Sequence, residues 1–127
     1  MGNQVLSFEV MGQDAPALRG FYEQVFGWTC SQAAAFDYWV VDTGGRGVLG
    51  GIGPVQAAGQ PGSAGFATFK VEVEDPAAVL AAAERLGGRT LMAVREIPGT
   101  GMQIAYLADP EGHVVGLSKG LPGRPDR

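Results

Sequence analysis

The chain repeats one pattern of secondary structure twice, and this repeat limits its fold more than any other feature. Residues 4–53 and residues 66–118 each predict a strand, a helix and three further strands. A four-stranded unit of about 55 residues is hardly stable alone, so we expect the two modules to pack together. The sequence therefore predicts an α+β fold built from two tandem βαβββ modules.

The first strand of each module alternates between apolar and polar side chains, so each strand is expected to present two different faces. The apolar face should pack in the core. The second face should line a cavity or meet solvent; it carries Val5, Ser7 and Glu9 in the first module and Thr68, Lys70 and Glu72 in the second. Aligning Phe8-Glu9-Val10 with Val71-Glu72-Val73 makes Glu9 and Glu72 equivalent.

Each predicted helix has its own start and stop signals. The first should begin at Asp14 and end at Gly27, and the second should begin at Asp75-Pro76 and end at Gly87-Gly88. Helical spacing then predicts two buried stripes, namely Leu18, Phe21, Tyr22 and Val25, and Val79, Leu80, Ala83 and Leu86.

The remaining segments complete the two modules. Asp109-Pro110-Glu111-Gly112 predicts a tight turn inside a strand–turn–strand stretch, Tyr106–Leu117. Residues 54–65 have the composition of a linker, and residues 119–127 are expected to form a loose tail. The other predicted strands are Trp28–Ser31, Phe36–Asp42, Val48–Gly53, Arg89–Val94, Gln103–Leu107 and His113–Leu117.

The composition fits one soluble domain that covers residues 1–127, with 46% hydrophobic residues and a net charge of −4. No basic stripe is present, so no nucleic-acid partner is expected. The single cysteine, Cys30, excludes an internal disulfide and a cysteine metal cluster. The sequence predicts no signal peptide and no membrane segment, so we expect a cytoplasmic protein without a membrane partner.

Two motifs carry a family resemblance that extends from about Gln4 to Ser118. They are FYEQVFGW, which closes the first helix, and ADPEGHVVGL near the end. A doubled βαβββ unit with these motifs resembles the vicinal oxygen chelate superfamily, which includes glyoxalase I, extradiol dioxygenases and bleomycin-resistance proteins, and here its glyoxalase-like branch. The resemblance implies a curved, cup-shaped mixed sheet with helices on its outer face. It also implies a ligand in the cup, often near a dimer interface.

The resemblance also implies where a divalent metal would be held. Its ligands would be a His or Gln early in the first strand, a His opening the second module, and a Glu four residues past the DPEG turn. The matching positions here are Val5 or Ser7, Thr68 and Gly116, which offer no competent set. The single histidine, His113, is interpreted as a turn or surface residue. We therefore predict no metal, which disfavours glyoxalase I and extradiol dioxygenase activity.

An all-oxygen metal site remains as an alternative. Glu9 and Glu72 would supply its carboxylates, and such a site favours Mg²⁺, Mn²⁺ or Ca²⁺. In the simpler interpretation, Lys70 pairs with one of these two carboxylates.

The preferred functional prediction is a metal-free protein that binds a small organic molecule as a homodimer. The expected ligand-binding residues mix polar and apolar groups, although the aromatic ones also fit ordinary core packing: Ser7, Glu9, Tyr38, Trp39, Lys70, Glu72, Met92, Met102 and Tyr106. Sequestration of a cationic, bleomycin-type drug is a special case of this prediction.

Two other functional classes stay open. One is a lyase or isomerase-type enzyme with Glu9 or Glu72 as general base and Lys70 stabilising an oxyanion, with or without a divalent metal. The other is an interaction module whose cup is filled by its own side chains.

Overall fold

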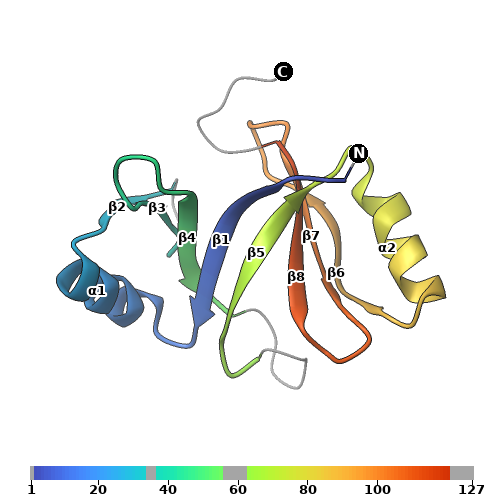
Figure 1. The fold of residues 1–127 in the computed structure, drawn as a ribbon, viewed down its shortest axis with the longest axis horizontal. Helices are drawn as coiled ribbons and strands as arrows, with labels where there is room; N and C mark the ends of the chain where they lie inside the picture. Colours follow the sequence, from blue (N-terminus) through green and yellow to red (C-terminus); the bar gives the residue numbers. More distant parts are fainter. Residues whose placement is uncertain (1, 34–36, 56–62, 121–127) are drawn as a thin grey trace. The chain divides into compact units, whose positions relative to one another are not determined.

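The two predicted modules are present in the computed structural model, which describes residues 2–33, 37–55 and 63–120 (Figure 1). Both modules have the order strand, helix and three strands, so the predicted α+β class with two βαβββ modules is confirmed. The predictions for residues 34–36, most of the linker and most of the tail lie outside the described residues. The elements are β1 (Val5–Gly12), α1 (Ala15–Phe26), β2 (Thr29–Gln32), β3 (Trp39–Asp42), β4 (Leu49–Pro54), β5 (Phe66–Glu72), α2 (Pro76–Arg85), β6 (Arg89–Glu96), β7 (Gln103–Ala108) and β8 (Val114–Lys119).

Aspartate caps start both helices, as predicted. The Asp14 carboxylate accepts a hydrogen bond from the Ala17 amide at 3.1 Å, and Asp75 accepts one from Ala78 at 3.2 Å. α1 ends at Gly27, whose φ of 70° lies in the left-handed region that favours glycine. In the described part of the chain, no helix is long and apolar enough to cross a membrane.

The chain divides into two units, and both contain the same mixed strand pairing. Residues 7–68 form one unit, with the strand order β2-β3-β4-β1. Residues 1–6 and 69–127 form the other, with the order β5-β8-β7-β6. In each unit the first and last strands of the module run parallel, and the remaining neighbours are antiparallel. The repeat in the sequence is therefore a repeat of topology.

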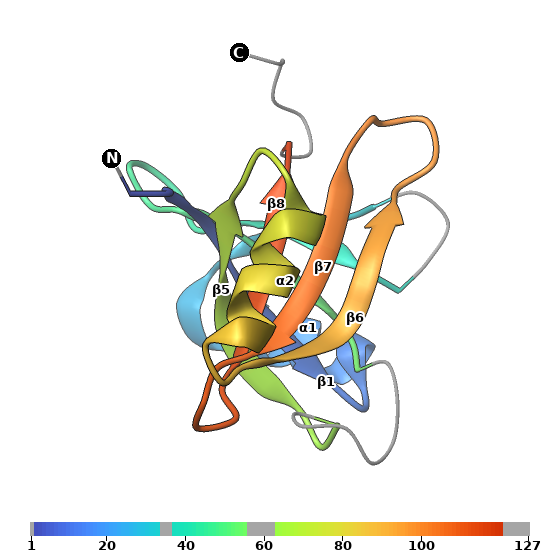
Figure 2. The same cartoon turned by 90° about the vertical axis from the view of Figure 1, so that its right-hand side faces the viewer.

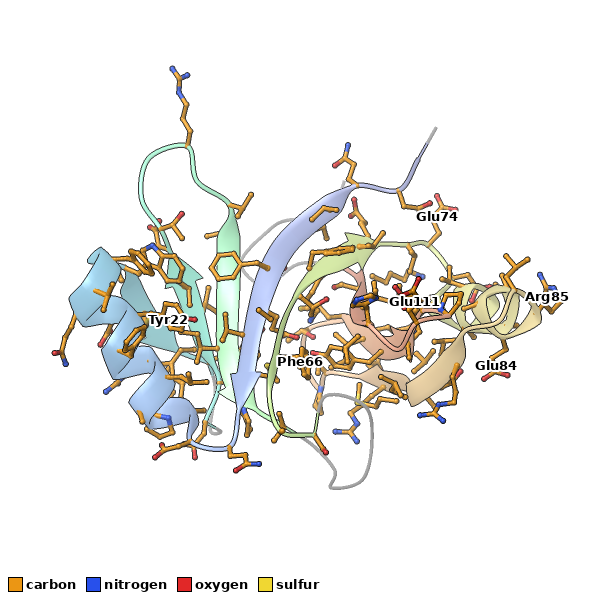
Figure 3. The ribbon with its side chains drawn as sticks, turned by 60° about the horizontal axis from the view of Figure 1, so that its bottom comes forward. Tyr22, Phe66, Glu74, Glu84, Arg85 and Glu111 are labelled. Atoms are coloured by element: carbon orange, nitrogen blue, oxygen red, sulfur yellow. The ribbon has the colours of Figure 1, made fainter. Side chains whose placement is uncertain are left out.

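In the first unit, α1 packs on one face of the sheet and forms a hydrophobic core there. Tyr22 points from α1 toward the strands (Figure 3), and its ring stacks on Trp28 with centroids 5.3 Å apart and planes 7° apart. Offset stacking of this kind adds to the burial of apolar surface. The buried members of this core are Ala15, Trp39, Val41 and Ile52.

In the second unit, α2 lies across one face of its sheet (Figure 2). Ala105 and Leu117 are register partners on β7 and β8, and both belong to the core between this sheet and α2. The buried members of this second core are Val73, Leu80, Ala105 and Leu117, with Val71, Val79, Val94 and Leu107 packed around them.

The predicted helix stripes are partly wrong. Phe21 and Val25 on α1 are 56% and 54% exposed, and Leu86 is 78% exposed. The apolar stripe of α1 is wider than the part of the helix that meets the sheet, so Leu18 and Tyr22 pack while Phe21 and Val25 face outward. Leu86 follows the last residue of α2 and serves as its C-cap, so it has left the buried face.

The predicted equivalence of Glu9 and Glu72 is also wrong, by two residues. Glu9 and Lys70 each lie five residues before the aspartate that caps the next helix. They also pair with matching positions of the fourth strand of their module, Glu9 with Gly51 and Lys70 with Gly116. The module repeat therefore places an acidic and a basic residue at equivalent sites.

Candidate functional site

The helix-free face of each sheet carries the polar residues that the sequence singles out. Phe8 on β1 and Val71 on β5 pack in the helix-side cores of their units. Side chains alternate along a strand, so Glu9, which follows Phe8, and Lys70, which precedes Val71, point to the opposite, helix-free face. Glu9 and Lys70 are both buried on these helix-free faces. The alternation predicted for the first strands is therefore confirmed, and the polar face is not simply solvated.

Glu9 makes a short polar contact in the first unit. The Tyr38 hydroxyl donates a hydrogen bond to Glu9 Oε2 at 2.5 Å, and Glu9 is only 1% exposed. A hydrogen bond to a carboxylate is stronger than one between neutral groups, so it fixes the Glu9 side chain in one orientation. Ser7, two residues earlier on the same face, is also buried.

Two glycines of β4 make room for the Tyr38 ring. A Cβ atom on Gly51 would overlap the Tyr38 hydroxyl, and one on Gly53 would lie 2.6 Å from Tyr38 Cδ2. A strand rich in glycine is weak by propensity, but here it lets a ring lie flat on the sheet. The position of Tyr38 beside Glu9 therefore depends on Gly51 and Gly53.

In the second unit, one row of register partners crosses the helix-free face. Lys70 on β5 pairs with Gly116 on β8, Gly116 with Tyr106 on β7, and Tyr106 with Met92 on β6. The Lys70 ammonium lies 5.9 Å from the centroid of the Tyr106 ring. A Cβ atom on Gly116 would lie 3.1 Å from Lys70 Cγ and 3.3 Å from Tyr106 Cε1. The space above Gly116 is thus taken by the lysine stem and the tyrosine ring.

The other predicted ligand-binding residues are distributed as follows. Glu72 is half-buried in the next row and pairs with Ser118, while its backbone amide donates to the Gln4 carbonyl at 2.8 Å. Met102 is buried just before β7. Trp39 belongs to the helix-side core, with the Arg19 guanidinium 5.2 Å from its ring centroid. The structure therefore separates Trp39 from Glu9, which lies on the opposite face.

The DPEG turn is held together by its aspartate. Asp109 Oδ1 accepts hydrogen bonds from the backbone amides of Glu111 and His113, both at 2.9 Å, and Asp109 Oδ2 lies 3.0 Å from His113 Nδ1. The hydrogen bond from the backbone amide of His113 is the main interaction that lowers the pKa of Asp109. His113 is exposed, so its predicted role as a turn and surface residue agrees with its position.

The described surroundings of Cys30 disfavour a reactive thiol. Burial is the main cause that raises its pKa, and the Glu23 carboxylate raises the pKa further, although the Arg19 charge lowers the pKa in part. A raised pKa keeps the thiol protonated, and the protonated form is a poor nucleophile. Cys30 also packs against the helix-side core, as expected for a structural residue.

The residues present do not fit the divalent metal that the resemblance implies. Gly116 offers no donor, and a glutamate there would require Lys70 and Tyr106 to move. Among residues 2–33, 37–55 and 63–120, no group of three or more His, Cys, Asp or Glu side chains is placed to hold a metal ion. A site built on Glu9 and Glu72 would supply two protein ligands, whereas a catalytic site normally has about three.

Sequence reasoning missed the glycines that organise both helix-free faces. By sequence alone, Gly51 and Gly53 indicate only a weak strand and Gly116 only a lost ligand, although each makes room for a neighbouring ring or lysine stem. The available signal was the alternation of Gly51 and Gly53 within one predicted strand, whereas the position of Gly51 and Gly116 opposite a charged residue is known only from the strand register. A glycine inside a strand often marks the close approach of another group.

The comparisons with known proteins agree with this architecture. A model of the glyoxalase-like domain family matches residues 8–118. No curated protein sequence matches the chain significantly. Among solved structures, a glyoxalase/bleomycin resistance protein/dioxygenase superfamily member from Vibrio splendidus 12B01 is similar, with a TM-score of 0.60 and 15% identity over 94% of this chain and 100% of that one.

Two epimerase structures are similar as well. Methylmalonyl-CoA epimerase from Mycobacterium tuberculosis has a TM-score of 0.60 and 13% identity over 96% of this chain and 94% of that one. A single-residue variant of the Streptomyces coelicolor methylmalonyl-CoA epimerase, in complex with 2-nitronate-propionyl-CoA, has a TM-score of 0.56 and 14% identity over 98% of this chain and 99% of that one. At these identities the likeness concerns the fold. Together with the family match over most of its length, it shows that the chain belongs to the glyoxalase-like domain family of the vicinal oxygen chelate superfamily.

Proposed function

We propose that this protein binds a small organic molecule without a metal ion, on the helix-free face of β5, β8, β7 and β6. The observation that carries the proposal is the space above Gly116, which is taken by Lys70 and Tyr106 where the resemblance implies a metal-binding glutamate. Binding sites are mostly apolar with a few polar groups. The row of Lys70, Tyr106 and Met92 has this mixture.

A thermal-shift screen tests the proposal. Wild-type protein would be heated with aromatic acids, thiol conjugates and cationic glycopeptides, once in EDTA and once with Mg²⁺, Mn²⁺ or Ca²⁺. We expect at least one ligand class to raise Tm by the same amount in both conditions. A ligand effect that requires the divalent ion would contradict metal-free binding. Failure of every class would favour the interaction module instead.

A second candidate function is an isomerase-type reaction with Glu9 as general base. Two observations favour it. Glu9 is a buried carboxylate that the Tyr38 hydroxyl orients at 2.5 Å, and the structural neighbours include methylmalonyl-CoA epimerases. In this reaction the carboxylate takes a proton from the carbon next to a carbonyl, and a proton is returned to that carbon after an enolate forms.

Deuterium exchange tests this second function. Methylmalonyl-CoA would be incubated with the protein in D₂O, and exchange of the proton next to the carbonyl would be followed by NMR. We expect exchange above the background rate with wild-type protein and its loss in the Glu9→Gln variant. Equal exchange by both proteins would exclude Glu9 as the base.

We also propose that the protein forms a homodimer. In the described part of the chain, β2 and β6 end their strand orders and each has one pairing neighbour. Exposed strand edges are commonly covered by another chain. Light scattering should therefore report twice the mass of the chain, and a monomer at micromolar concentration would contradict the proposal.

A further inference from the structure

We infer that Lys70 and Tyr106 form a subsite for the anionic oxygen of a ligand, so that the ligands of this protein are small carboxylates or enolates with an apolar body. This inference rests on the proposed function and names the class of ligand. It concerns one unit of the chain and one row of its sheet, which consists of Lys70, Gly116, Tyr106 and Met92.

Gly116 brings the lysine and the tyrosine together. Neighbouring strands lie about 4.8 Å apart, so residues two strands apart do not normally touch across an intervening side chain. Gly116 has no side chain, and both Lys70 Cγ and Lys70 Cε lie close to the position its Cβ would take. The stem therefore lies over β8 and carries the ammonium to 5.9 Å from the Tyr106 ring centroid.

This arrangement buries a positive charge. Lys70 as a whole residue is 8% exposed, and burial of a lysine side chain removes hydration from its ammonium. The face of an aromatic ring attracts a cation but accepts no ordinary hydrogen bond. An ammonium has three donor hydrogens, so it can bind a ligand oxygen in addition to a protein partner.

The surroundings of the ammonium favour one chemistry and one direction of approach. Beyond the Tyr106 ring, Met92 continues the row with a thioether, which suits an aromatic or aliphatic body. Glu72 lies on the same face two residues along β5, in the neighbouring row, and its carboxylate disfavours a second anion there. A bound carboxylate is therefore expected on the Tyr106 side of Lys70, and its body over Tyr106 and Met92.

The two lysines of the chain, Lys70 and Lys119, offer a matched test. Lys119 is the exposed last residue of β8. Lys119→Met and Lys70→Met each remove one positive charge. The probes are benzoate and benzamide, which have the same ring but differ in charge. The chain has three tyrosines. Incorporation of 3-fluorotyrosine therefore gives three ¹⁹F signals, which tyrosine-to-phenylalanine variants assign.

We expect benzoate to shift the Tyr106 signal saturably and to leave the Tyr22 signal in place. Loss of one charge-assisted hydrogen bond predicts about tenfold to hundredfold weaker benzoate binding in Lys70→Met and equally weak binding of benzamide to wild type. Lys119→Met should bind benzoate like wild type. If Lys70→Met does not fold, the ratio of benzoate to benzamide affinity in wild type and in Lys119→Met decides the question.

Two results would overturn the inference. Equal binding of benzoate and benzamide at Tyr106 would show that the face binds ligands without a preference for charge, and the proposed function would stand. A Tyr106 signal that benzoate leaves unmoved up to its solubility limit would reject the anion subsite. The proposed function would then depend on the thermal-shift screen alone.

Discussion

Replacement of Gly51 by alanine should destabilise the protein, because the Tyr38 ring fills the space that the new methyl group needs. The methyl carbon would overlap the Tyr38 hydroxyl, so the ring must move away from Glu9. Loss of a hydrogen bond to a charged group costs about 1.5–3 kcal/mol, and a methyl group forced into filled space costs about 1–3 kcal/mol. Since the ring can relax in part, we expect the free energy of unfolding to fall by about 3 kcal/mol.

Urea unfolding followed by circular dichroism measures this loss. Gly20→Ala is the matched control, because Gly20 lies inside α1 and the nearest atom to a new Cβ is Gln24 Nε2 at 4.0 Å. That variant should be about 1 kcal/mol more stable than wild type, since alanine is the better helix former. The double variant Gly51→Ala/Tyr38→Ala should lose little beyond Tyr38→Ala alone. A Gly51→Ala variant within about 0.5 kcal/mol of wild type would refute the role given to Gly51.

Three further predictions concern the framework. Tyr22→Ala should lower the free energy of unfolding by about 3 kcal/mol and Phe21→Ala by less than about 1 kcal/mol, because Tyr22 stacks on the core while Phe21 is exposed; equal losses in urea would contradict the observed packing. Asp75→Ala should cost about 1 kcal/mol through loss of the α2 cap, seen as a lower urea midpoint. The pKa of Asp109 is lowered in the folded state from 3.8, so its stabilisation should be complete above that value and vanish as the pH falls through the lower folded pKa. The stability difference between wild type and Asp109→Asn should therefore shrink on acidification. A difference that grows instead would contradict the claim that the ionised form of Asp109 stabilises the folded state.

The local signals in the sequence predicted the framework well. Asp14 and Asp75 could be recognised as caps because a cap depends on residues only three positions away. The DPEG turn was predicted for the same reason, and Gly112 does adopt a positive φ of 91°. The strand alternation was correct because the period of two follows directly from the backbone.

Long-range packing explains the parts that could not be predicted. The contact between Tyr38 and Glu9 joins residues 29 positions apart and depends on Gly51, which no local rule connects to either. The exposure of Phe21 depends on how much of α1 the sheet covers, and the sequence does not give this width. The equivalence of Glu9 with Lys70 required the strand register, because a similar tripeptide two residues away supported the wrong alignment.

The corrected equivalence changes how the two modules are understood. Each module has a charged residue paired with a glycine, Glu9 with Gly51 and Lys70 with Gly116, and the two charges are of opposite sign. A tyrosine lies beside the glycine in each pair. In the second module, the side chains of Lys70 and Tyr106 take the space that a metal-binding carboxylate at position 116 would need. We therefore propose that charged and aromatic side chains of the chain itself bind the ligand.

Calorimetric titration of untagged, EDTA-treated and dialysed protein with Mn²⁺ and Ni²⁺ tests this central claim most directly. We expect no saturable heat for either ion at concentrations where binding of one ion per chain would be measured. Saturable binding of one ion per chain, abolished in a Glu9→Gln or Glu72→Gln variant, would contradict it.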